Sequence, residues 1–221
     1  MLHLHYFPGN ASMSPHILLE ELGVPYELHF VDRANAAHKA PAFLALNPNG
    51  LIPVLVDDAA SLAAGEPLVL FETAAICLHL ADTHAGAGLA PPLGTPARAH
   101  FYKWLAWLTN TLQAALIVYF YPERWADDAA GIAQVKAHAE AKIGTMLDIL
   151  DAQLAASGGP WLLGERFSAV DPYAFMLCRW TRGFGRPART LAHVSPYLDR
   201  MLMRPAVQRA LAQEKLVAPW V

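Results

Sequence analysis

The sequence predicts a two-domain protein, with an α/β domain over residues 1–84 and an all-α domain over residues 96–221. In the first part, segments with the alternating apolar pattern of strands are interspersed with segments of helical periodicity. In the second part, every periodic segment has helical periodicity. Between the two parts, Gly86, Gly88 and the pair Pro91-Pro92 interrupt both patterns, as is typical of a linker. Each part is long enough to bury a hydrophobic core of its own.

The α/β domain begins with a strand–helix–strand unit. Apolar residues alternate over residues 2–7, a helical pattern runs over 15–22, and a second strand is expected over 26–31. Ser14 is expected to cap the helix and Gly23 to end it. Two strands joined by one helix over so short a length form a parallel pair with a right-handed crossover.

Two further strands and a helix complete this domain. After a short helix within 36–46, strands are expected over 52–56 and 68–71, joined by a hairpin loop that contains Gly65. A helix follows from residue 72. A strand–helix–strand unit followed by a strand–strand–helix unit is a thioredoxin-like arrangement.

The second domain is expected to consist of helices alone. The periodic segments are about 96–121, 127–156, 169–182, 193–203 and 205–213. Ser168 and Asp171 form a capping-box signature at the start of the third of these helices.

An uncharged stretch over residues 104–122 is long enough to span a bilayer. Four polar residues interrupt it, and each of them is costly in hydrocarbon. They are Thr109, Asn110, Thr111 and Gln113. We therefore expect a buried helix of a globular domain and no membrane partner.

Composition and charge narrow the class of protein. Hydrophobic residues make up 55% of the chain and charged residues 16%, which indicates a folded protein with a large core. The formal net charge is −3 and the 16 Lys and Arg are scattered, so no nucleic-acid partner is expected. Cys77 and Cys178 are expected to be buried free thiols. With no signal peptide recognised, these thiols suggest a cytoplasmic protein.

Histidine is abundant, with 10 residues, which raises the question of a metal site. His3 and His5 share one strand face, but no group of Cys, His and Asp has a recognised zinc spacing. Structural roles are therefore expected for these histidines, and no metal site is expected.

Two short motifs in the first domain indicate a binding site for a small peptide. Pro53 follows an Asn-Pro-Asn-Gly turn and opens a strand, a context that favours a cis Ile52–Pro53 bond. The backbone groups of Ile52 then point outward, where they can pair with an extended peptide. Glu72-Thr73 begins a helix, either as a routine cap or as a carboxylate-binding helix N-terminus, and we favour the second interpretation.

With these motifs the chain resembles glutathione transferases over nearly its whole length. The resemblance implies a glutathione transferase fold, with glutathione as the co-substrate and a homodimer as the assembly. It places the cysteinyl part of glutathione at Ile52 and Pro53, and the γ-glutamyl end at Glu72 and Thr73. His38-Lys39 resembles the position that holds the glycine carboxylate in several classes, although such a pair alone is typical of a solvated loop.

The loop from Tyr6 to His16 most resembles that of the bacterial Beta class, whose pattern is Tyr-x-Pro-Gly-Ala-Cys-Ser-x-Ser-Pro-His. Ala11 stands where that class has its cysteine, and Gln113 stands where it has a histidine. Mixed-disulfide chemistry through a cysteine of this loop is therefore not expected.

Transfer of glutathione needs its thiol ionised near neutral pH, below a free pKa of about 8.5. A nearby hydrogen-bond donor can stabilise the thiolate. We rank Ser12 first because it adjoins the missing cysteine. Asn10 is second because it falls near the serine of the Delta and Theta classes and near the asparagine of Nu-type enzymes. Tyr6 is third because it resembles the tyrosine of other classes.

The electrophile is expected to bind along the first long helix of the second domain, at Trp107, Asn110, Thr111 and Ala114. Aromatic residues at helical spacing are also typical of a core. The expected activity is conjugation of glutathione to small hydrophobic electrophiles, a detoxification reaction. Two alternatives remain: a non-catalytic, regulatory glutathione-binding protein of the same fold, and a glutathione-dependent peroxidase or disulfide reductase.

Overall fold

The computed structural model describes residues 1–62 and 65–221, which form two compact units. The first unit comprises Met1–Ala90 and Met203–Val217, and the second comprises Pro91–Leu202 and Ala218–Val221. The last helix, α9 (Pro205–Gln213), therefore belongs to the unit that contains the sheet, whereas the sequence-based division counts it with the all-α domain.

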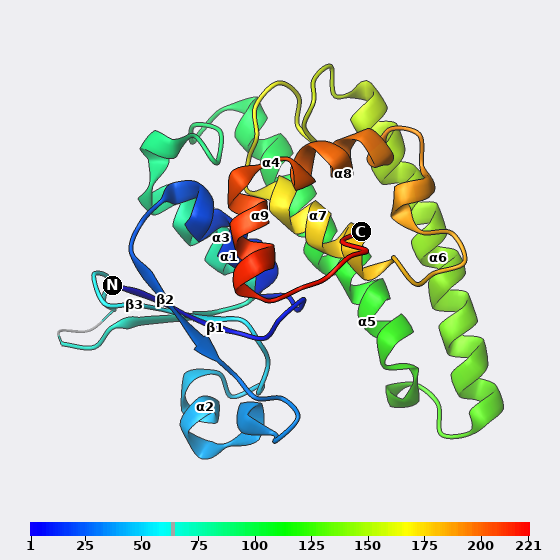
Figure 1. Cartoon of the computed structure of the whole chain (residues 1–221), viewed down its shortest axis with the longest axis horizontal. Helices are drawn as coiled ribbons and strands as arrows, with labels where there is room; N and C mark the ends of the chain where they lie inside the picture. Colours follow the sequence, from blue (N-terminus) through cyan, green and yellow to red (C-terminus); the bar gives the residue numbers. More distant parts are fainter. Residues whose placement is uncertain (63–64) are drawn as a thin grey trace. The chain divides into compact units, whose positions relative to one another are not determined.

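The first unit contains a four-stranded mixed sheet with the strand order β2-β1-β3-β4 (Figure 1). The strands are β1 (Leu2–Tyr6), β2 (Tyr26–Phe30), β3 (Val54–Asp57) and β4 (Leu68–Phe71). β1 and β2 are parallel, whereas β3 is antiparallel to both β1 and β4. The expected thioredoxin-like arrangement is confirmed.

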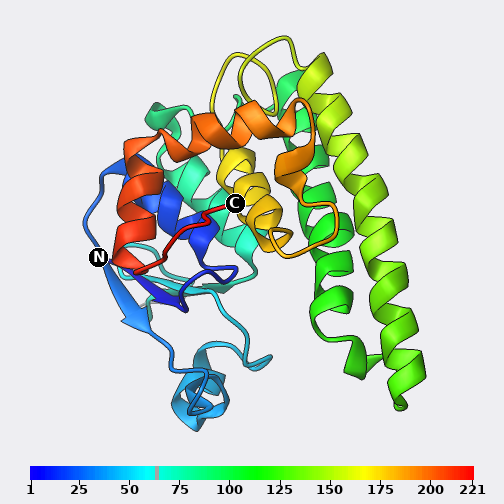
Figure 2. The ribbon, with the colours of Figure 1, turned by 45° about the vertical axis from the view of Figure 1, so that its right-hand side comes forward.

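Helices pack on both faces of this sheet. They are α1 (Met13–Leu22), α2 (Pro41–Leu46) and α3 (Thr73–Thr83), with short 3-10 turns at Ala37–Lys39 and Ala85–Ala87. α1 packs against α3 and also against α9, which runs beside it in Figure 1 and Figure 2. On the opposite face, Phe43 of α2 packs with Val31 and Val54 in a small core of its own.

Helix α1 begins two residues before the expected start. Ser14 therefore lies inside the first turn, buried, with its Oγ 3.3 Å from Sγ of Cys77, and the expectation that it caps the helix is wrong. Gly23 ends the helix as expected, with a φ of 63° that glycine adopts without strain.

The second unit is helical. Its helices are α4 (Pro96–Trp107), α5 (Ala114–Phe120), α6 (Ala129–Ala156), α7 (Val170–Trp180) and α8 (Val194–Leu202), with 3-10 turns at Pro122–Arg124 and Ala188–Thr190. A π-helical segment, Leu108–Gln113, joins α4 to α5, so the single helix expected over 96–121 is interrupted. The all-α character expected for this part is confirmed.

Two polar residues of the uncharged stretch, Thr109 and Gln113, have a partner inside this unit. The hydroxyl of Tyr173 on α7 lies 2.7 Å from Oγ1 of Thr109 and also donates to the side-chain oxygen of Gln113. Buried polar groups are normally paired in this way. Among the described residues, no helix is both long and apolar enough to cross a membrane.

The capping box before α7 forms only in part. The buried carboxylate of Asp171 accepts the N–H of Ser168 at 2.8 Å and the N–H of Leu162 at 2.9 Å. The hydroxyl of Ser168 donates to the same carboxylate instead of capping the helix. Since the helix begins at Val170, Pro172 lies in the first turn, where its missing N–H is not needed.

Candidate functional site

The segment that precedes β3 presents unpaired backbone groups. The Ile52–Pro53 bond is cis, as the sequence predicts. Asn47, which is buried, donates from its amide to the carbonyl of Leu51 at 2.8 Å and accepts the N–H of Asn49 at 3.1 Å, so it holds the turn in place. Within the described part of the chain, the backbone N–H and C=O of half-buried Ile52 have no hydrogen-bond partner. They can pair with an extended peptide.

A cationic side chain lies beside this turn. A Cβ on Gly50 would lie 2.8 Å from the carbonyl oxygen of His38 and 2.8 Å from Nζ of Lys39. With a φ of 61°, this position requires glycine for both conformation and space. The Lys39 ammonium therefore lies next to the segment that leads to Ile52.

His38 lies in the same 3-10 turn as Lys39. Its Nδ1 is buried and, over the residues that the structure describes, has no hydrogen-bond partner. Burial lowers the pKa of this imidazole, and the cations of Arg33 and Lys39 lower it further. His38 is therefore a neutral group at pH 7 with one unused ring nitrogen.

The start of α3 has an unusual backbone. Glu72 occupies the N-cap position at a φ of 74°, a region that side-chain-bearing residues rarely adopt, and its exposed carboxylate does not cap the helix. Thr73 is the first helical residue and is buried at 5% exposure, and its hydroxyl has no partner within the described structure. The routine-cap interpretation therefore does not apply. Backbone strain at a helix N-terminus that can bind an anion points to a functional role.

The loop between β1 and α1 holds two of the three expected thiol activators. Ser12 has 0% exposure, and its Oγ accepts the N–H of Phe7 and donates to the Phe7 carbonyl, both at 3.2 Å. Asn10 is half-buried, and its Oδ1 accepts the N–H of Ala11 at 2.7 Å. In the described structure, the Nδ2 donor of Asn10 has no partner. Ser12 therefore closes the loop, whereas Asn10 keeps a free donor.

A buried carboxylate that follows α9 supports this loop. Oε2 of Glu214 accepts the N–H of Gly9 at 2.7 Å, and its Oε1 lies 2.8 Å from Nδ1 of His16. Both side chains are 0% exposed. Sequence reasoning did not single out Glu214, because nothing in its local pattern marks a contact with a loop some 200 residues away.

Tyr6, the third expected activator, lies at the end of β1. Its ring lies 6.2 Å from that of His16 and 6.0 Å from that of Phe30, measured between ring centroids. Burial raises the pKa of the Tyr6 phenol, and the nearby Glu214 carboxylate raises it further. Tyr6 is therefore a neutral group at pH 7 and can act only as a hydrogen-bond donor or acceptor.

The second unit contains a cavity of about 580 Å³ between the π-helical segment, α5 and α6. Its lining includes three of the four residues expected for the electrophile, namely Asn110, Thr111 and Ala114. Trp107, the fourth, is not part of this lining, and its ring packs against that of Trp104 at 5.1 Å.

Comparison with known proteins decides the family. Residues 11–83 match the model of the glutathione S-transferase N-terminal domain, and residues 133–200 match that of the C-terminal domain. The glutathione S-transferase GST-4.5 of Xanthomonas campestris is 32% identical over 213 residues, which cover 96% of this chain and 98% of that protein. The chain belongs to the glutathione S-transferase family.

Two further relatives add chemical context to this transferase. The disulfide-bond oxidoreductase YfcG of Escherichia coli is 30% identical over 219 residues, which cover 98% of this chain and 97% of that protein. A glutathione transferase homologue from Sulfitobacter, solved with bound glutathione, matches with a TM-score of 0.84 at 28% identity, covering 98% of this chain and 99% of that one. The fold and the enzyme class expected from the sequence are confirmed.

Proposed function

We propose that this transferase binds glutathione on its first unit and ionises the thiol for attack on a small hydrophobic electrophile. The observation that carries the proposal is a set of unused polar groups in that unit, at Ile52, Thr73 and Asn10. Solved relatives from Sulfitobacter and Burkholderia graminis hold glutathione, which supports glutathione as the co-substrate.

The orientation of glutathione follows from the chemistry of these groups. The free N–H and C=O of Ile52 suit the main chain of the cysteinyl residue. The N-terminus of α3 and the Thr73 hydroxyl suit the γ-glutamyl carboxylate, and the exposed Glu72 carboxylate suits its ammonium. Lys39, with the unused nitrogen of His38 nearby, suits the carboxylate of the glycine end.

We infer that Asn10, and not Ser12, faces the glutathione sulfur. The hydroxyl of Ser12 is buried and already bonded to both backbone groups of Phe7, so no donor is left for a thiolate. The free amide donor of Asn10 can stabilise the sulfur anion while the thiol proton leaves to water. This order reverses the one expected from the residue types alone, and Tyr6 stays third.

The electrophile is assigned to the cavity of the second unit. Small and apolar side chains such as Ala114, Ala115 and Val118 share its lining with a few polar groups, a composition that suits small hydrophobic molecules. Trp107 stays a candidate at its margin, since it immediately precedes the π-helical segment.

Thr73→Val tests the glutathione site, because valine keeps the shape of threonine and removes the hydroxyl. We expect glutathione binding, measured by calorimetry, to weaken about tenfold, as for loss of a hydrogen bond to a charged group. Thr145→Val, on an exposed face of α6, is the matched control and should bind as the wild type does. Equal affinities of the two variants would contradict the proposed orientation.

Turnover separates the enzyme from a non-catalytic binding protein. Conjugation is measured with a panel of aryl halides, epoxides and enones at saturating glutathione. Retention on immobilised glutathione without turnover of any of these electrophiles would favour the regulatory alternative.

Glutathione-dependent disulfide reduction is a second candidate function. A relative is named a disulfide-bond oxidoreductase, and a relative from Burkholderia graminis was solved with two glutathione molecules per subunit. Cys77 and Cys178 are buried, and burial raises the pKa of each thiol to about 12, so neither suits redox exchange. Two glutathiones would then supply both sulfurs of the product: the thiolate of one attacks the glutathione sulfur of a mixed disulfide between the other and the substrate. This step forms glutathione disulfide and releases the substrate thiol. Formation of glutathione disulfide from a glutathionylated thiol tests this reaction.

We also propose a homodimer and a cytoplasmic location. The family resemblance is the basis for the dimer, and sedimentation of the purified protein tests it. Two free, buried cysteines fit a reducing compartment. Fractionation of the cells that produce the protein tests the location.

A further inference from the structure

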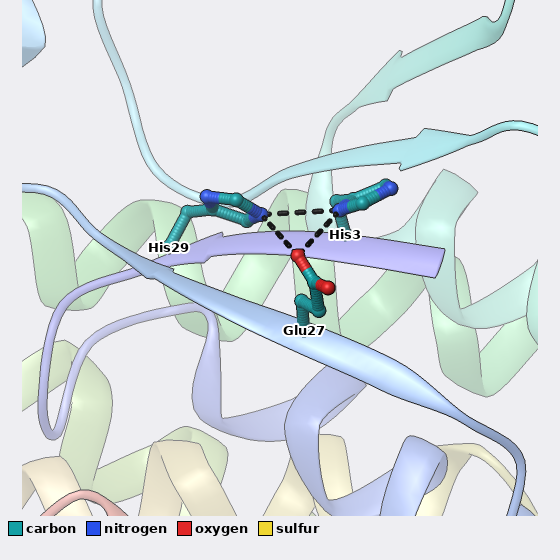
Figure 3. Close-up of side chains that lie close together, drawn as sticks. All are labelled: His3, Glu27 and His29. Atoms are coloured by element: carbon teal, nitrogen blue, oxygen red, sulfur yellow. Dashed lines mark hydrogen bonds and ion pairs between the residues drawn. The ribbon is translucent and has the colours of Figure 1, made fainter. Parts of the chain in front are cut away.

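Three side chains from β1 and β2 bring their ligand atoms together on one face of the sheet (Figure 3). In the parallel register, His3 pairs with Glu27 and His5 pairs with His29. Because alternate residues of a strand share a face, all four side chains lie on the face opposite to Leu4. Figure 3 shows His3, Glu27 and His29 directed toward one common point.

The separations between these atoms match those around a zinc ion. Nδ1 of His3 lies 3.1 Å from Nε2 of His29 and 3.4 Å from Oε2 of Glu27. Nε2 of His29 lies 3.6 Å from Oε2 of Glu27. Ligands at the usual zinc distances, in a tetrahedral arrangement, lie about 3.3 Å from one another. The three atoms therefore already occupy one face of a tetrahedron.

A carboxylate outside this triangle orients His3. Nε2 of His3 lies 2.9 Å from Oδ2 of Asp58, which can accept a hydrogen bond from this ring nitrogen. When Nε2 carries the proton, Nδ1 presents its lone pair to the centre of the triangle. A carboxylate–histidine pair of this kind is the usual outer support of a metal-binding histidine.

Solvent access also suits a cation. The side chains of His3, Glu27 and His29 are 23%, 57% and 43% exposed, so an ion can enter from water. His5 stacks on His29 at 5.0 Å between centroids. The His5 ring therefore packs against His29 on the same face of the sheet.

We propose that His3, Glu27 and His29 bind one divalent cation of the zinc type, with water as the fourth ligand. Imidazole and carboxylate ligands suit Zn²⁺ and leave one position open. Because the ligands come from two strands, the ion links β1 to β2 and stabilises the first unit. On binding, the proton of His29 moves to its Nδ1, and the hydrogen bond between the two imidazoles is replaced by two bonds to the metal.

Zinc titration of the tag-free protein tests the proposal, followed by calorimetry and by the midpoint of thermal unfolding. The wild type should bind one equivalent of Zn²⁺ and unfold at a higher temperature with it. Glu27→Gln and His29→Ala should lose both effects, and Asp58→Asn should bind about tenfold more weakly, as expected for an outer-shell partner. His100→Ala, which removes a histidine of the second unit, is the matched control and should behave as the wild type does.

The absence of zinc binding by the wild type would overturn the proposal. So would the binding of one equivalent with unchanged affinity by Glu27→Gln, a variant of an exposed side chain that leaves the core intact. Circular dichroism checks the fold of His29→Ala, and if that variant does not fold, the comparison of Glu27→Gln with His100→Ala decides.

Discussion

At the scale of single residues, Glu72 combines a strained backbone with a carboxylate that we propose to bind glutathione. A side-chain-bearing residue at a φ of 74° is destabilised relative to glycine. We expect the unfolding free energy of Glu72→Gly to lie within about 1 kcal/mol of the wild-type value. The relief of backbone strain in the folded state offsets the added conformational freedom of the unfolded chain. Its affinity for glutathione should fall about tenfold with the loss of the carboxylate.

Glu72→Ala is the matched variant for this prediction, since it removes the carboxylate and keeps the strain. It should bind glutathione as weakly as Glu72→Gly does. In urea unfolding it should be about 1 kcal/mol less stable than Glu72→Gly. Undiminished glutathione affinity in both variants would remove Glu72 from the site.

Two glycines with similar backbones predict different costs for an added methyl group. Gly50 and Gly23 have φ values of 61° and 63°, but only at Gly50 does a Cβ meet other atoms, at 2.8 Å. Gly23→Ala should cost about 1–2 kcal/mol of unfolding free energy from conformation alone. Gly50→Ala should cost more and should also weaken glutathione binding, because the His38 carbonyl and Lys39 must move. Equal effects of the two changes on stability and on binding would contradict the proposed position of Lys39.

Residue types indicated the candidate site, but not the use of each side chain. The motifs at Ile52-Pro53 and Glu72-Thr73 are readable because their turn and helix-start contexts are local. Whether a hydroxyl is free or already bonded depends on packing, and this is why Ser12 ranked above Asn10 in the sequence. The His3, Glu27 and His29 cluster has no recognised spacing, since the parallel register of two strands creates it.

At the scale of elements, a polar network joins α1 to α9. The carboxylate of Glu20 is bonded by Arg209, Tyr26 and Gln213. Burial raises the pKa of Glu20, but these hydrogen bonds outweigh burial and the net pKa is lowered. A carboxyl with a lowered folded pKa stabilises the protein above its unfolded pKa, and this contribution is lost as the pH falls through the folded value.

We therefore expect the wild type to lose stability as the pH falls below about 4.5, the ordinary pKa of Glu20. Glu20→Gln should be about 1–2 kcal/mol less stable than the wild type at pH 7. The difference should shrink as the pH falls through the lowered pKa of Glu20, because the wild-type carboxyl then becomes neutral as well. Urea unfolding at several pH values measures it, and a difference that stays constant with pH would contradict this role of Glu20.

Helix boundaries were the least predictable part of the elements. Periodicity located each helix, but α1 starts at Met13, earlier than its proline suggests, and Ser14 packs against Cys77 instead of capping the helix. The π-helical segment has no local signature. Two of its polar residues, Thr109 and Gln113, contact Tyr173 on α7, and this contact is visible only in three dimensions.

At the scale of the whole molecule, the two-part organisation and the family were predictable from the sequence. Segments with strand periodicity end before the linker, and only segments with helical periodicity follow it, so the hydrophobic pattern of the sequence alone predicts the fold class. The membership of α9 in the first unit was not readable, because it rests on contacts such as those of Arg209 with Glu20 and of Glu214 with Gly9. Through Glu214, the end of the chain supports the loop that carries Asn10.

The thiol pKa of bound glutathione tests the central claim most directly, by titration of thiolate absorbance at saturating glutathione. We predict a pKa well below the free value of about 8.5 in the wild type. It should return toward that value in Asn10→Ala and stay near the wild-type value in Ser12→Ala and Tyr6→Phe. An unchanged pKa in Asn10→Ala, together with a raised one in Ser12→Ala, would contradict the account.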